Sequence, residues 1–160
     1  MNLLILRVLL AALPLLGLAL EARSGLIYGG LAAGIFLLTA TIFLLIRPAL
    51  PRTVQRLVYF LVLLALTILA GRIHSVSFLI FVSLLLLSPP ELFQKRRRRN
   101  GILRAAVLSS LAFFIFLSLH GLLAQGLGLG GRMRFFQHPA GSYFLGGLTL
   151  MIFSTGRPKK

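Results

Sequence analysis

Few side chains in this 160-residue sequence are able to do acid–base, nucleophilic or metal chemistry. It contains three histidines, two acidic residues and no cysteine. Without cysteine there is no disulfide, thiolate metal site or Cys nucleophile. Glu21 and Glu91 do not form a carboxylate pair, and His74, His120 and His138 lack the spacing of metal ligands. The sequence therefore predicts no catalytic site of its own, no metal and no cofactor, and leaves open whether the chain is a non-catalytic subunit of an enzyme.

Single polar residues inside apolar runs are the remaining candidates. His120 is a candidate proton relay, although a contact near a helix end is the favoured interpretation. Arg7 lies so close to the start of the first run that we expect its guanidinium to reach the headgroup region. Hydroxyl side chains in the runs are expected to bond to their own helix or to a neighbouring one, and they are Thr39, Thr41, Ser83, Ser109 and Ser110.

The composition says what kind of molecule must position these residues. Hydrophobic types make up 58% of the chain, charged types only 12%, and the mean hydropathy is +0.99. Soluble domains carry about 25% charged residues, so a soluble enzyme is excluded. The net charge of +15 comes from short basic clusters between apolar runs. That pattern is typical of the loops of a membrane protein and not of a nucleic-acid-binding face, so we expect no nucleic-acid partner.

Six apolar runs predict an all-α integral membrane protein with six transmembrane helices. We expect Pro14 to break or kink the first helix, and Pro48 and Pro89 to end the second and fourth. The segment 125–138 is rich in glycine and is expected to be a loop. The runs are Leu3 to Leu20, Gly25 to Ile46, Val54 to Gly71, Ile73 to Ser88, Ile102 to about Ala124, and Ala140 to Phe153.

Two further patterns concern packing and orientation. Gly25/Gly29 and Gly30/Gly34 have the GxxxG spacing that lets helices pack closely, although a plain glycine-rich helix has the same appearance. Most of the 17 basic residues fall in loops on the side of the termini, which predicts that both termini are cytoplasmic. The strongest basic run is expected to contact anionic lipid headgroups or an acidic partner surface, and it consists of Lys95, Arg96, Arg97, Arg98 and Arg99.

The chain divides into two segments of similar design, residues 1–72 and 73–160. Each holds three apolar runs, and the odd number per segment inverts the second relative to the first. We therefore expect two inverted three-helix halves.

Several stretches occur in the order and spacing of one known family. They are the Leu13-Pro14 segment in the first run, the small-residue run Gly25 to Thr41, the series Arg47, Pro51 and Val54, the segment Glu91 to Phe93, and His138 to Phe144 before the last run. In this order they resemble the paired integral subunits of the Rnf and Na⁺-translocating Nqr electron-transport complexes, the RnfA/RnfE and NqrD/NqrE family. The alternative is that only a common membrane architecture is shared.

The resemblance implies six helices in inverted halves, a pseudo-symmetric partner of the same family, and a [2Fe–2S] cluster held by cysteines from the first and fourth helices. The matching positions here are Leu13 and Leu84. An alkyl side chain cannot bind iron, so this chain is not expected to hold the cluster.

These observations together predict a cofactor-free scaffold subunit of a multi-subunit complex related to Rnf/Nqr, with other integral membrane subunits and anionic lipids as partners. The chain is expected in the bacterial inner membrane as a multi-pass protein, where it is a non-catalytic subunit of an oxidoreductase complex if that complex is redox-active. The alternatives are a small transporter or permease component for a lipid or anionic solute, and a structural subunit of an unrelated envelope complex.

Overall fold

The computed structural model describes residues 3–71, 77–88, 99–129, 135 and 138–155. Throughout these residues the chain is helical, with short turns and no strand, which confirms the all-α prediction. The helices are α1 (Leu3–Leu16), α2 (Ala22–Ile46), the short 3₁₀ helix η1 (Arg47–Ala49), α3 (Arg52–Gly71), α4 (Ser77–Leu87), α5 (Arg99–Leu129) and α6 (Pro139–Thr155).

Three of the described helices are long and apolar enough to cross a membrane, and this fits a membrane protein. The segments concerned are Ala22–Ala49, Thr53–Gly71 and Gly101–Leu127. α1, α4 and α6 are shorter. The 11 residues of α4 rise about 16 Å at 1.5 Å per residue, roughly half of a 30 Å hydrocarbon core. Six complete crossings therefore stay a prediction.

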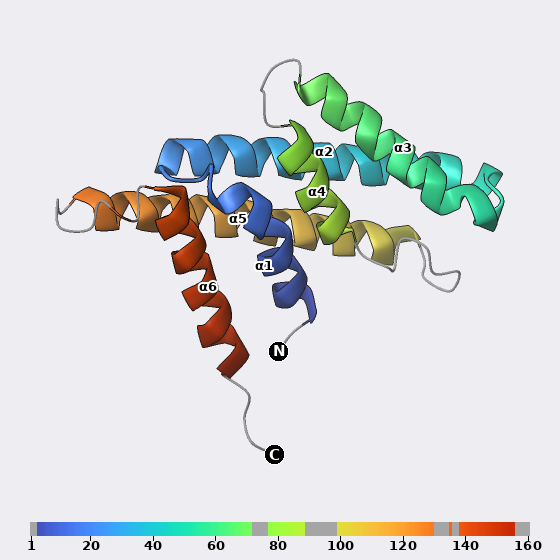
Figure 1. Cartoon of the computed structure of the whole chain (residues 1–160). Helices are drawn as coiled ribbons and strands as arrows, with labels where there is room; N and C mark the ends of the chain where they lie inside the picture. Colours follow the sequence, from blue (N-terminus) through green and yellow to red (C-terminus); the bar gives the residue numbers. More distant parts are fainter. Residues whose placement is uncertain (1–2, 72–76, 89–98, 130–134, 136–137, 156–160) are drawn as a thin grey trace.

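The two longest helices form the centre of the molecule. α2 and α5 lie side by side and run in opposite directions (Figure 1). The short helices α1 and α4 also pack on each other and run in opposite directions. α3 lies against α2 and α4, and α6 lies against α1. The first helix of each predicted half thus contacts the first helix of the other, and the same holds for the second helices.

Of the three prolines predicted to interrupt or end helices, Pro48 follows the end of α2, Pro14 lies inside α1, and Pro89 lies outside the described residues. α1 continues through Pro14 but ends at Leu16, two residues later. α2 ends just before Pro48, which lies in η1. At the start of α2, the hydroxyl of Ser24 accepts a hydrogen bond from the backbone N–H of Glu21 at 3.1 Å. Because proline lacks an N–H donor, Pro14 and Pro48 each remove one helical hydrogen bond.

The loop predicted for residues 125–138 is wrong in its first part. α5 continues through Gln125 and Gly126 to Leu129. Glycine in a helix costs only about 1 kcal/mol relative to alanine. In an apolar environment, leaving backbone N–H and C=O groups without partners costs more, so the helix continues through the glycine. Residues 130–134 lie outside the described residues.

Apolar side chains fill the interior and also cover the outside. Buried aromatic residues at the helix contacts include Phe36, Phe43 and Phe113. Many large apolar side chains point outward on the long helices, among them Leu38, Leu45, Leu57, Leu69, Leu108 and Leu119. An apolar exterior of this kind is expected where lipid, and not water, surrounds the helices.

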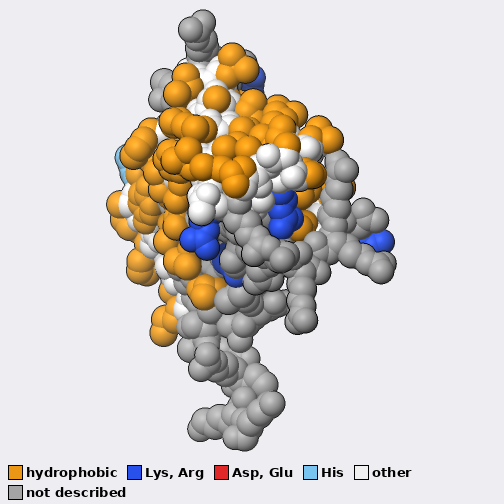
Figure 2. All heavy atoms as spheres, turned by 90° about the vertical axis from the view of Figure 1, so that its right-hand side faces the viewer, with side chains coloured by type: hydrophobic (Ala, Val, Ile, Leu, Met, Phe, Trp, Pro, Cys, Tyr) orange, Lys and Arg blue, Asp and Glu red, His pale blue; other side chains and the backbone are white. Residues whose placement is uncertain are grey.

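Basic side chains gather at one end of the long helices. Arg47 follows the last residue of α2, Arg56 lies near the start of α3 and Arg104 near the start of α5. Figure 2 shows this end, where arginine side chains lie beside a broad hydrophobic surface. Arg23 lies at the other end of α2. Arg99 begins α5 at the basic end, whereas Lys95, Arg96, Arg97 and Arg98 lie outside the described residues.

Candidate functional site

The C-terminal end of α1 is held by a buried chain of hydrogen bonds that involves three helices, which we name the α1 clamp. The hydroxyl of Ser142 in α6 donates to the backbone carbonyl of Leu16 at 2.5 Å. The same hydroxyl lies 2.6 Å from Nε2 of His120 in α5. All three residues are buried. The Leu16 carbonyl also accepts the backbone N–H of Ala19 at 3.2 Å, so Ser142 adds a second hydrogen bond to this helix end.

The direction of these bonds decides what the α1 clamp is able to do. A carbonyl oxygen only accepts, so the hydrogen of the Ser142 hydroxyl is committed to Leu16. The contact with His120 must then use an N–H of the imidazole as donor. His120 does not activate Ser142 as a nucleophile, and the chain ends at a carbonyl that cannot pass a proton on. This geometry favours an anchor over the proton relay considered for His120.

An equivalent arrangement holds the end of α4, and we name it the α4 clamp. The hydroxyls of Tyr59 in α3 and Ser88 after α4 lie 2.8 Å apart. Ser88 also donates to the carbonyl of Leu84 at 2.9 Å. The ring of Phe43 in α2 meets Tyr59 edge-on, with centroids 5.3 Å apart and an interplanar angle of 84°. Each short helix is therefore held at its C-terminal end by a helix from the other segment: α6 holds α1, and α3 holds α4.

A close backbone contact joins α2 to α5 beside the α1 clamp. A Cβ added to Gly25 would lie 2.6 Å from the carbonyl oxygen of Leu117. A Cβ added to Gly121 would lie 2.5 Å from the carbonyl oxygen of Glu21. The side-chain oxygen of Gln125 accepts a hydrogen bond from the N–H of Ala22 at 3.1 Å. Only glycine permits this approach at both positions.

The two predicted GxxxG pairs have different surroundings. Gly29 is buried, and a Cβ there would lie 3.4 Å from atoms of Phe114 and Leu117. Around Gly30 the nearest atom is 3.7 Å away on Phe114, and around Gly34 nothing lies within 4 Å. Gly25 and Gly29 therefore lie in the contact between α2 and α5, whereas Gly34 is exposed on the outside of α2.

Leu13 and Leu84, which the sequence resemblance aligns with cluster ligands, lie on helices that pack on each other. Leu84 in α4 is fully buried, and Leu13 in α1 is partly buried against the same apolar core. Neither side chain has a lone pair for iron. Among the residues that the structure describes, no three His, Cys, Asp or Glu side chains come close enough to hold a metal ion.

Ser83, next to Leu84, differs from the buried hydroxyls that form described hydrogen bonds. Its Oγ is buried and has no hydrogen-bond partner. Thr39 and Thr67, by contrast, donate to carbonyls one turn earlier in their own helices, at 2.7 and 2.5 Å. Ser110 donates to Val107 at 2.9 Å, in agreement with the expectation that such hydroxyls bond locally.

Sequence reasoning did not assign the clamp roles of Tyr59, Ser88 and Ser142 or the contact at Gly121. The available signal was a small or polar residue within an otherwise apolar run, but sequence alone does not give the opposite partner. His138 is exposed just before α6. His74 and Glu91 lie outside the described residues.

Comparisons with models of protein families, with curated proteins and with solved structures found no match to this chain.

Proposed function

We propose that the chain is a cofactor-free, membrane-embedded scaffold subunit of a multi-subunit complex, built on the plan of the Rnf/Nqr integral subunits. The observation that carries the proposal is the pairing of helices. α1 packs on α4 and α2 on α5, each pair running in opposite directions, as two inverted three-helix halves require. The two clamps also support this pairing, because α6 of the second half holds α1 of the first half and α3 of the first half holds α4 of the second.

The absence of ligand groups at Leu13 and Leu84 supports a scaffold and not a redox carrier. Both positions lie in or against the apolar core of the α1–α4 contact, where the family would place its cysteines. A partner of the same architecture would complete the complex. The exposed apolar faces of α2, α3 and α5 are available to such membrane-embedded partners and to lipid.

The orientation belongs to the same proposal. Arg47, Arg56 and Arg104 lie at one end of the long helices. By the positive-inside rule, this end faces the cytoplasmic side of the bacterial inner membrane. A chain without cysteine permits a clean test by labelling single introduced cysteines. Ala49→Cys should react with an impermeant maleimide from the cytoplasmic side and Glu21→Cys from the other side. The reverse pattern would contradict the orientation.

A carrier for an anionic solute or lipid remains the alternative, and Ser83 is the observation that favours it. An unpartnered hydroxyl inside a helix pair is available to a transported ligand. The other buried hydroxyls described above argue against a carrier, because each of them forms its hydrogen bond with another group of this protein. Reconstitution of the chain alone in liposomes separates the two functions, because a scaffold gives no flux of anions or lipids and a carrier does.

Purification of the tagged protein from native membranes in mild detergent tests the scaffold proposal directly. We expect flavin- and iron–sulfur-containing subunits to co-purify and the isolated chain to hold no iron. Co-purification of an unrelated set of proteins would reassign the complex. Stoichiometric iron on the chain alone would contradict the cofactor-free assignment.

A further inference from the structure

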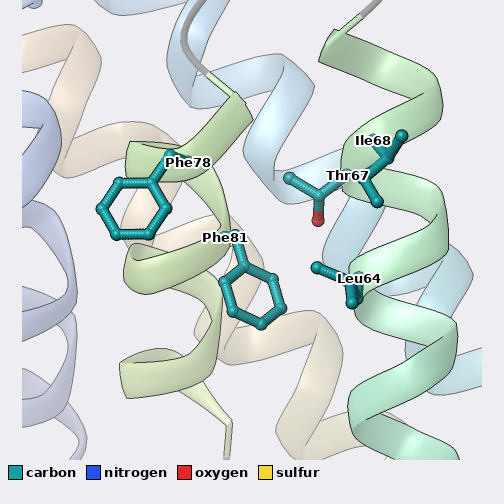
Figure 3. Close-up of a pocket in the computed structure, with 5 residues that line it drawn as sticks. All are labelled: Leu64, Thr67, Ile68, Phe78 and Phe81. Atoms are coloured by element: carbon teal, nitrogen blue, oxygen red, sulfur yellow. The ribbon is translucent and has the colours of Figure 1, made fainter.

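A groove opens between α3 and α4 at the end of the molecule where these two helices connect. Its lining residues come from the last two turns of α3 and the first two turns of α4, and they are Leu64, Thr67, Ile68, Phe78 and Phe81. Figure 3 shows Phe81 directed from α4 toward Leu64 on α3, with Thr67 and Ile68 above them. At the rim, Phe78 is 74% exposed and Ile68 58% exposed. The groove therefore opens sideways, onto the apolar outside of the helices.

The lining favours hydrocarbon over any polar ligand. Four of the five side chains are wholly apolar. The fifth, Thr67, donates its hydroxyl hydrogen to the carbonyl of Leu63 at 2.5 Å and has no hydrogen left for a ligand. Among the residues that the structure describes, no charged side chain lines the groove. A solute with hydrogen-bonding groups would leave them unpaired here, which costs several kcal/mol in an apolar site.

The size and position of the groove further restrict which ligands fit it. Its volume of about 160 Å³ is close to that of an apolar cavity known to accept benzene, which means about six carbons. A whole lipid does not fit, but one segment of a chain does. Ile68 lies three residues before the end of α3, and Phe78 is the second residue of α4. The segment that enters is therefore close to the membrane surface and to the headgroup.

α3 is the spanning helix with the least protein around it. Only 17% of its span is buried, against 44% for that of α2. Its neighbours within the chain, α2 and α4, cover one side. In a membrane, hydrocarbon chains lie along the parts of α3 that no other helix covers, and a chain beside the groove mouth enters the groove without leaving the membrane.

We propose that this groove is a binding site for one acyl chain of a phospholipid, in the leaflet at the α3–α4 connection and opposite the end that carries Arg56. The first carbons of the chain occupy the groove between Leu64 and Phe81. The remainder lies along the exposed side chains of α3. The site is independent of the scaffold function, since it rests on the α3–α4 contact alone.

The first test measures phospholipid retained per chain after exhaustive exchange of the purified full-length protein into detergent. Leu64→Phe fills the groove and should lower retention about tenfold, equal to 1.4 kcal/mol. Leu61→Phe is the matched control, because it adds the same group to an exposed position of α3 outside the groove. Equal retention in both variants and in the unmodified chain would overturn the proposal.

Thr67→Val distinguishes hydrocarbon from a polar ligand. It removes the hydroxyl and keeps the branched shape, so an acyl chain should be retained as before. Loss of lipid in Thr67→Val at unchanged unfolding stability would mean that the ligand is bound through the hydroxyl, contrary to the proposal. This comparison also decides the matter if Leu64→Phe fails to fold.

Photocrosslinking locates the ligand. A phospholipid with a diazirine near the carboxyl end of one chain, added to vesicles of phosphatidylcholine or phosphatidylglycerol, should give adducts concentrated on Ile68 and Phe78. Adducts spread evenly over the exposed residues of α2, α3 and α5 would indicate unspecific lipid contact and contradict a site. Efficient disulfide dimers of Phe78→Cys in membranes would instead mean that a second copy covers the groove, which would also overturn the proposal.

Discussion

Gly25 on α2 and Gly121 on α5 face each other across the tightest contact between the two central helices. A Cβ on either glycine would reach a backbone carbonyl oxygen of the other segment, at 2.6 Å from Leu117 and 2.5 Å from Glu21. Burial of apolar surface does not drive helix association in lipid as it does in water. Close packing of this kind is therefore what holds α2 on α5.

We expect Gly121→Ala to lower the free energy of unfolding by about 1–3 kcal/mol, because the added methyl group must push the two backbones apart. Gly34→Ala is the matched control, with nothing within 4 Å of its Cβ. Alanine there should be neutral or stabilising by up to about 1 kcal/mol, because alanine favours the helix over glycine. Unfolding in mixed micelles of dodecylmaltoside and SDS measures both, and equal effects would contradict the assigned contact.

Ser142→Ala should destabilise the protein by about 1–3 kcal/mol, because it leaves His120 without its buried partner and the Leu16 carbonyl with only the N–H of Ala19. His120→Leu removes only one of the two bonds and should cost less. The double variant should cost less than the sum of the two, since the interaction between them is already lost. The same unfolding assay gives the coupling, and strict additivity would mean that His120 and Ser142 act independently.

Tyr59→Phe should cost about 0.5–1.5 kcal/mol, the usual contribution of a single hydrogen bond, because its ring stays in place against Phe43. Ser88→Ala removes the same contact and also the bond to Leu84. Proteolysis after α4 offers a second readout, because both changes release the end of this helix. If Tyr59→Phe has no effect on either measurement, the α4 clamp contributes nothing to stability.

Ser83→Ala should not lower the free energy of unfolding, in contrast to the substitutions in the two clamps. The buried hydroxyl of Ser83 has no partner, so its removal should leave the free energy of unfolding unchanged or raise it by about 1 kcal/mol. Ser142→Ala, a chemically identical change at a bonded position, is the control. A marked loss of stability in Ser83→Ala would show that this hydroxyl is bonded in the membrane, for example to a ligand, and would favour the carrier alternative.

Local features of the fold could be read from the sequence because each has a local physical cause. The apolar run Gly25 to Ile46 and Pro48 predict a second helix, and α2 extends from Ala22 to Ile46. The exposed Arg56 and Arg104 lie at one end, as the distribution of charge predicts. The end of α5 was misjudged because glycines such as Gly126 are as common in loops as they are acceptable in an apolar helix.

The clamps and the groove could not be predicted because they depend on pairs of residues far apart in the chain. Ser142 reads as one small residue in an apolar run, and only the fold brings it to Leu16. Gly25 was singled out by its spacing, whereas its partner Gly121 has no glycine four residues before or after it. The periodicity of the sequence predicts the helix face on which a polar residue lies, but it does not predict which helix packs against that face.

The α1 clamp has a consequence for the biosynthesis of the protein. Ser142 is synthesised 126 positions after Leu16, the residue whose carbonyl it contacts. Until Ser142 has been added, the Leu16 carbonyl has only the backbone N–H of Ala19 as its hydrogen-bond partner, at 3.2 Å. A chain cut short before residue 139 lacks α6, so the end of α1 then receives no hydrogen bond from that helix.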